Sequence, residues 1–132
     1  MMPLDTRHKI VSAEEAIRLA LDLHRQGRVV RVVTGYFDLL LAEHVRRLEE
    51  LAQGESLFAV VLDHPGALLS VRARAELLAA LAVVRCVAAV EVPQVEDFLH
   101  RFAWREIVRE EETDGRRLQA FIEHVHRRQR VQ

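Results

Sequence analysis

The sequence predicts an α/β domain in which helices cover both faces of a parallel sheet. Short apolar runs rich in valine, at 29–33, 57–62 and 87–92, are typical of strands that are buried on both sides. Between them lie segments with apolar residues three or four positions apart on a charged background, which indicates amphipathic helices. Strands that alternate with helices through short connections favour parallel pairing with right-handed crossovers.

The length and composition indicate a single domain with its own core. The chain has 132 residues, of which 50% are apolar and 5% aromatic, so leucine, valine and alanine must fill the interior. The formal net charge of −1 gives no reason to expect nucleic acid or a membrane as a partner. We find no signal peptide and no apolar run long enough to span a bilayer. Cys86, the single cysteine, lies in an apolar run, and a buried free thiol suits a cytoplasmic location.

The first elements follow from capping and turn residues. Residues 1–9 have no periodic pattern and are expected to form a loose N-terminal lead-in. A helix is predicted after Ser12, because its hydroxyl can accept from a first-turn amide while Glu15 reaches back in a capping box. Gly27 is expected to end this helix, and the first strand, at 29–33, follows at once.

The rest of the chain continues the alternation of strands and helices. In order, we predict a helix at 41–53, a strand at 57–62, a turn at 63–66, a helix from the N-cap Ser70 to about 84, a strand at 87–92, a short helix at 95–102, a short strand at 106–108 and a last helix at 115–128. The acidic run at 110–112 is interpreted as a solvated loop, and His124 and His126 as surface positions.

The turn after the first strand has the most specific sequence. Residues 34–44 read TGYFDLLLAEH, and this segment resembles the signature of the HxGH nucleotidylyltransferases, which typically reads T-x-G-x-F-D-x-x-H-x-G-H. The chain is most similar to the heptose 1-phosphate adenylyltransferase domain, and the resemblance covers about residues 9–92. It implies a Rossmann-like, doubly wound sheet. The alternation of elements alone would also fit a flavodoxin-like or receiver domain.

The resemblance also implies a reaction and a site. In this family a substrate phosphate attacks the α-phosphorus of a nucleoside triphosphate, Mg²⁺ accompanies the nucleotide, and pyrophosphate leaves. The protein must hold two polyanions together and neutralise charge that shifts during the displacement. By resemblance, a nucleotide or phosphorylated small molecule would bind in a crevice, and the chain would form a homodimer. The candidate crevice residues are Thr34, Gly35, Tyr36, Phe37, Asp38, His44 and Arg74.

Most of these residues also have a structural interpretation. Gly35 suits the close approach of a phosphate, but any tight strand-to-helix turn can require glycine. We expect Phe37 to pack beneath the turn and Asp38 to cap the next helix, although in the family Asp38 would shape the pocket. His44 is the one candidate catalytic residue. It is either a hydrogen-bond donor to the phosphate oxygens or a non-functional remnant of the motif.

The departures from the family motif weaken the case for catalysis. Leu41 stands where the family has the first histidine, and loss of one preorganised donor costs a factor of about 10²–10³ in rate. Glu43 replaces the motif glycine with a bulky carboxylate that would repel a triphosphate. The loop at 64–69 carries no lysine or arginine, and the acidic run at 110–112 replaces a turn rich in serine and threonine.

No other chemistry is specified by the residue spacing. Asp38, His44, Asp63 and His64 could all reach the carboxyl edge of the sheet, but their spacing defines no metal site, and we predict none. A receiver domain would need an acidic cluster after the first strand and a later lysine, whereas Lys9 is the only lysine.

We therefore expect a nucleotidylyltransferase-like domain with a degenerate motif. It would bind a nucleotide or phosphate weakly without catalysis, or serve as an interaction module. The alternative is an active transferase with an altered sugar or alditol phosphate substrate, which uses His44, Arg74 and Mg²⁺.

Overall fold

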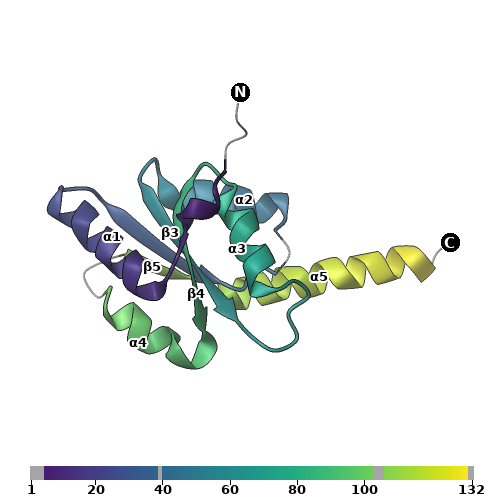
Figure 1. Cartoon of the computed structure of the whole chain (residues 1–132). Helices are drawn as coiled ribbons and strands as arrows, with labels where there is room; N and C mark the ends of the chain where they lie inside the picture. Colours follow the sequence, from purple (N-terminus) through teal and green to yellow (C-terminus); the bar gives the residue numbers. More distant parts are fainter. Residues whose placement is uncertain (1–4, 39, 103–105, 131–132) are drawn as a thin grey trace.

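Five parallel strands form the centre of the computed structural model, which describes residues 5–38, 40–102 and 106–130 (Figure 1). The strands are β1 (Ile10–Val11), β2 (Val30–Gly35), β3 (Ser56–Asp63), β4 (Val84–Glu91) and β5 (Glu106–Arg109), and they lie in the order β1-β4-β3-β2-β5. The helices are α1 (Ala13–Arg25), α2 (Ala42–Ala52), α3 (Val71–Ala79), α4 (Val95–His100) and α5 (Glu111–Arg130), with 3₁₀ turns at η1 (Arg7–Lys9) and η2 (Val92–Gln94).

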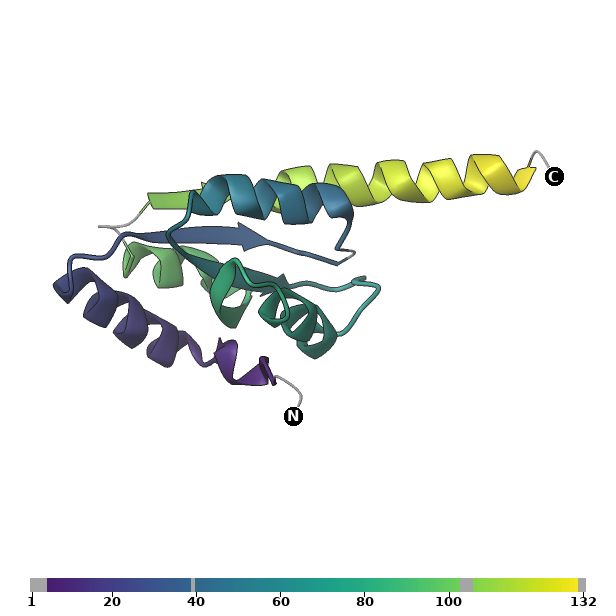
Figure 2. The same cartoon turned by 90° about the horizontal axis from the view of Figure 1, so that it is seen from above.

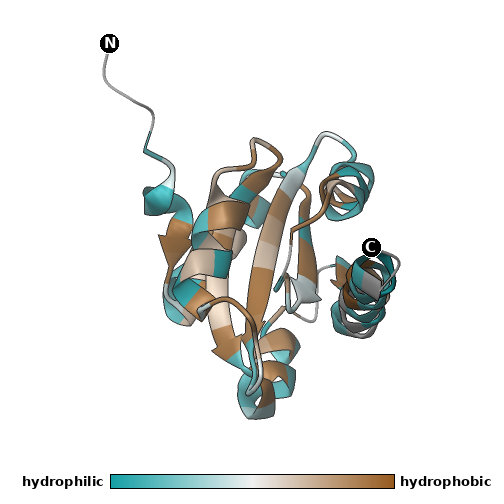
Figure 3. Ribbon diagram, turned by 90° about the vertical axis from the view of Figure 1, so that its right-hand side faces the viewer, coloured by the Kyte–Doolittle hydropathy of each residue, from teal (hydrophilic) through white to brown (hydrophobic). Residues whose placement is uncertain are grey.

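The core has two layers, one on each face of the sheet. Helices α1 and α4 pack on one face, around Phe58, Leu62 and Phe98, and α2 and α3 pack on the other, around Leu48 and Leu78. Hydrophobic residues accordingly concentrate on the strands of the sheet (Figure 3). The predicted α/β domain with a Rossmann-like parallel sheet between two layers of helices is confirmed.

The strand order places a change of direction next to β2. From β2 the chain moves outward to β3 and β4 through α2 and α3, and then returns through α4 to β5 on the other side of β2. The carboxyl ends of β2 and β5 therefore flank the topological switch point, where open α/β sheets bind their ligands.

The predicted caps of the early helices are present. The Ser12 hydroxyl accepts from the amide of Glu15 at 3.1 Å, and Ser70 does the same for Ala73 at 3.1 Å. The reciprocal bond of the capping box is not formed as predicted, because the Glu15 carboxylate accepts from the Ser12 hydroxyl. Gly27, with φ of +76°, follows the end of α1 as expected.

The junction of α3 and β4 and one additional strand differ from the sequence prediction. Helix α3 ends at Ala79 instead of about residue 84, because β4 begins at Val84 and pairs with β3 along its length. The two-residue strand β1 was not predicted, since two residues are too short to show alternation. Of the predicted N-terminal lead-in at 1–9, residues 1–4 lie outside the described residues. At its end, the Lys9 ammonium donates a hydrogen bond to the Leu81 carbonyl at 3.0 Å.

The last helix begins earlier than predicted and extends beyond the sheet. Helix α5 starts at Glu111 rather than at Gly115, so the acidic run belongs to the helix and its entry instead of a loop. In two perpendicular views α5 runs beyond the end of the sheet (Figures 1 and 2). In the part of the chain that the structure describes, none of the helices combines the length and the apolar character that crossing a membrane requires.

Candidate functional site

The switch point lies between Thr34 and Gly35 of β2 and the residues that follow β5. Strands β2 and β5 pair from Arg31 to Thr34, and the amide of Glu110 then donates to the Thr34 carbonyl at 2.8 Å. This bond brings the start of α5 directly against the carboxyl end of β2. The sequence analysis predicted that Thr34 and Gly35 of β2 belong to a candidate site. It did not predict that the start of α5 lies beside them.

Two carboxylates of the chain occupy the switch point. Glu110 is only 6% exposed, and its carboxylate accepts from Nε of Arg47 at 2.8 Å. Glu111 accepts from the buried Thr34 hydroxyl at 2.6 Å and from Nε of Arg109 at 2.6 Å. The prediction of a solvated acidic loop is therefore wrong for Glu110 and Glu111, because three partners from other positions draw these carboxylates inward.

The protonation of Glu111 reflects this environment. Burial alone would raise the pKa of its carboxyl group, but hydrogen bonds from Thr34, from its own amide and from Arg109 outweigh burial and lower the pKa below its usual value. Since the folded-state pKa is lowered, these contacts stabilise the fold above the unfolded-state pKa and are lost as the pH falls. The carboxylate is thus negatively charged at neutral pH.

Asp38 ties the β2 turn to the loop before α3. Its carboxylate is 4% exposed and accepts from the amides of Leu68 at 2.7 Å and Leu69 at 2.9 Å. The prediction that Asp38 caps the next helix is wrong, because Leu41 occupies the N-cap position of α2. The two consecutive amides come from a loop distant in sequence, which local capping rules do not cover.

Arg74 is buried beneath the same edge of the sheet. Its side chain is fully buried, and Nη1 donates to the carbonyls of Tyr36 at 2.8 Å and Leu62 at 2.9 Å. Nε donates to Leu69 at 3.2 Å, and Nη2 lies 3.4 Å from Asp63. Each nitrogen of the guanidinium therefore faces an oxygen of the chain.

His44 takes part in the first turn of α2. The ring is 4% exposed, and its Nδ1 accepts from the Leu41 amide at 3.0 Å. An imidazole that accepts at Nδ1 and is neutral carries its proton on Nε2. Leu41 is half-buried and Glu43 is exposed, and both lie in the same helix start as His44.

The remaining candidate residues lie at the end of β2 and in the turn that follows it. Gly35 is the last residue of β2 and pairs with Val61, and Phe37 is 2% exposed in the core, as predicted. The ring of Tyr36 lies 4.2 Å from that of His64. Nδ1 of His64 lies 3.0 Å from the Pro65 carbonyl oxygen, whereas its buried Nε2 has no hydrogen-bond partner among the described residues.

Sequence reasoning missed the basic partners at this site. Arg47 lies on the exposed side of a helical pattern, and nothing in its spacing indicates a contact with Glu110. The strand order alone supplies this contact, since it places β5 beside β2. Among the described residues, no three histidine, cysteine, aspartate or glutamate side chains are grouped as a metal site would require.

No protein-family model matches the sequence, and no curated protein matches it significantly. The geometry of the site therefore carries the functional argument.

Proposed function

We propose that this chain is a nucleotidylyltransferase-like domain that has lost nucleotidyl transfer, retains only weak affinity for nucleotides or phosphate, and acts through interactions. The observation that carries this proposal is the pair of carboxylates at the switch point. Glu110 and Glu111 occupy the edge of the sheet where a Rossmann-like fold would otherwise present free groups to a phosphate chain.

The other candidate groups also favour a non-catalytic site. The Thr34 hydroxyl donates to Glu111, and the Arg74 guanidinium donates to main-chain carbonyls. The Asp38 carboxylate holds two amides. A phosphate would have to displace these contacts, and it would compete with the carboxylates of Glu110 and Glu111 for Arg47 and Arg109. If an arginine partner were drawn away, a phosphate charge about 4 Å from the carboxylate would be repelled by about 4 kcal/mol at an effective dielectric constant of about 20.

Neutralising these carboxylates is expected to increase nucleotide affinity. The double variant Glu110→Gln/Glu111→Gln keeps the shape of both side chains and removes two negative charges. Calorimetric titration with Mg²⁺ and ATP or CTP should show at least about tenfold tighter binding than the original chain shows.

The control is Glu49→Gln/Glu123→Gln, which removes the same charge from exposed positions on α2 and α5. It should leave the affinity within about twofold of the original value. If both double variants bind nucleotide equally, the carboxylates at the switch point are not what weakens binding, and the proposal loses its main support.

Helix α5 supports the interaction role. Its Phe121 is 40% exposed, and Ile122 and Val125 remain half-buried on a helix that extends past the sheet (Figure 2). The helix sequence is acidic at its start and basic at its end, so two antiparallel copies would place opposite charges side by side. We propose self-association of two copies through this face.

Self-association is expected to depend on Phe121. Sedimentation velocity at about 100 μM should show a dimer for the original chain and a monomer for Phe121→Ser, because the aromatic ring is the largest exposed apolar group of this face. Gln119→Ser changes an exposed polar side chain of the same helix and should leave the dimer intact. A monomeric original chain at this concentration would exclude the α5 dimer.

A further inference from the structure

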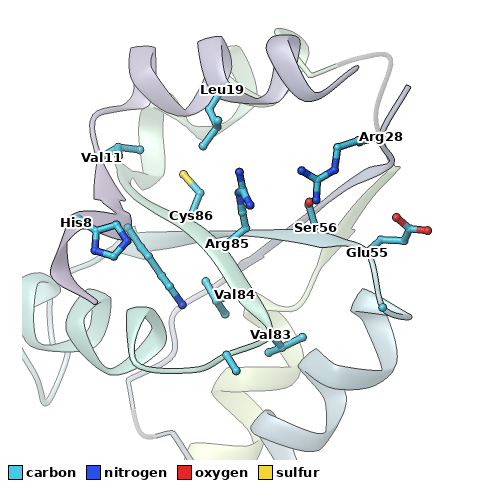
Figure 4. Close-up of a pocket in the computed structure, with 13 residues that line it drawn as sticks. His8, Val11, Leu19, Arg28, Glu55, Ser56, Val83, Val84, Arg85 and Cys86 are labelled. Atoms are coloured by element: carbon cyan, nitrogen blue, oxygen red, sulfur yellow. The ribbon is translucent and has the colours of Figure 1, made fainter. Parts of the chain in front are cut away.

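A cavity lies at the amino edge of the sheet, opposite to the switch point. Its volume is about 610 Å³, which is within the usual range for sites that bind small molecules. The cavity lies between α1 and the starts of β3 and β4, remote from the switch point (Figure 4). Its lining includes Leu19, Arg28, Ser56, Arg85 and Cys86.

Arg85 reaches this cavity because of an irregularity in β4. Leu57 of β3 pairs with Val84 and the next residue, Phe58, pairs with Cys86, so Arg85 is an extra residue in β4. Such a bulge changes the direction of a side chain, and bulges are over-represented next to functional sites. Arg85 is exposed although both of its neighbours are buried, and it extends toward Leu19 of α1 in Figure 4.

Arg28 provides a second guanidinium at the same cavity. It lies in the connection between α1 and β2, and in Figure 4 its side chain points toward Arg85. Elsewhere arginines pair with carboxylates, as Arg31 does with Glu106 and Arg101 with Glu14. Within the described residues, neither Arg28 nor Arg85 forms a salt bridge or a side-chain hydrogen bond.

The other charged groups leave this cavity positive. Lys9 lines it while its ammonium donates to the Leu81 carbonyl, and the His8 ring contacts the Asp5 carbonyl through Nδ1 at 2.8 Å. Glu55 is the one carboxylate among the lining residues, and it is exposed at the rim. The lining residues therefore include three cationic side chains and one carboxylate, and of the three cations Arg28 and Arg85 have no hydrogen-bond or salt-bridge partner among the described residues.

We propose that this cavity binds a phosphate monoester of a small organic molecule. A guanidinium offers planar, paired donors that match phosphate oxygens, and two guanidinium groups can neutralise a doubly charged headgroup. Val11, Leu19 and Cys86 form an apolar wall beside them, which the organic part of the ligand would contact. The site is separate from the switch-point crevice, so it does not depend on the function proposed above.

Titration with glycerol 3-phosphate and with inorganic phosphate tests this site. At constant ionic strength, glycerol 3-phosphate should bind saturably and shift the backbone amide resonances of Arg28, Ser56 and Cys86. It should bind more tightly than inorganic phosphate, because only the ester has an organic part. Arg85→Gln and Arg28→Gln should each weaken binding by about tenfold or more, since each removes hydrogen bonds to a charged group.

The controls separate this site from general charge and from the other edge of the sheet. Arg25→Gln removes an exposed arginine that is paired with Asp22 near the same edge, and it should change the affinity by less than about twofold. At the other edge of the sheet, the backbone amide resonances of Thr34 and Gly35 should not follow the same binding curve. The proposal is wrong if binding does not saturate by about 10 mM, if inorganic phosphate binds as tightly as the ester, or if Arg25→Gln weakens binding as much as Arg85→Gln.

Discussion

Replacing Arg74 with methionine is expected to destabilise the fold by about 3–5 kcal/mol. The substitution keeps much of the apolar stem but removes the donors that satisfy the carbonyls of Tyr36, Leu62 and Leu69. Each buried carbonyl left without a partner costs about 1–3 kcal/mol. Urea denaturation followed by circular dichroism would measure the change in the free energy of unfolding.

Arg72 provides a matched control two positions earlier on the same helix. Its side chain is 59% exposed and pairs with Glu76 one turn away. Arg72→Met should change the free energy of unfolding by no more than about 0.5 kcal/mol, as expected for an exposed pair. Equal effects at the two positions would mean that the buried hydrogen bonds of Arg74 stabilise the fold no more than an exposed ion pair does.

The second large effect concerns catalysis. We expect nucleotidyl transfer to proceed at less than about 10⁻³ s⁻¹, whereas ordinary enzymes turn over at about 1–10³ s⁻¹. Leu41 offers no donor where the HxGH motif, which this segment resembles, has a histidine, and a missing donor costs about 10²–10³ in rate. Arg74 already donates within the protein, which removes a second source of positive charge.

The carboxylates at the switch point add to this loss. Glu110 and Glu111 lie beside Thr34, where a triphosphate in a Rossmann-like site would develop charge during the displacement. Negative groups there oppose the transition state as well as the bound nucleotide. Three independent features therefore point to the same loss of activity.

The architecture could be predicted because its signals are local and repeated. Valine-rich runs, such as 57–62, and the caps Ser12 and Ser70 define strands and helix starts without knowledge of the rest of the chain. The boundary between α3 and β4 was less accurate, because pairing with β3 extends the strand into a segment that also suits a helix.

The candidate site was harder to predict because long-range contacts determine it. Asp38 contacts amides 30 and 31 residues away, and Thr34 contacts Glu111, 77 residues away. An acidic run with no apolar periodicity resembles a solvated loop in the sequence. Only the position of β5 beside β2 buries Glu110 and brings Glu111 against Thr34.

Pyrophosphate release by the original chain tests the central claim most directly. The protein would be incubated with each nucleoside triphosphate, Mg²⁺ and a panel of sugar and alditol phosphates, with an active member of the nucleotidylyltransferase family as the positive control. The proposed loss of function predicts no release above the rate without protein. Turnover at about 1 s⁻¹ or faster with any pair of substrates would contradict it and would identify the chain as a working transferase.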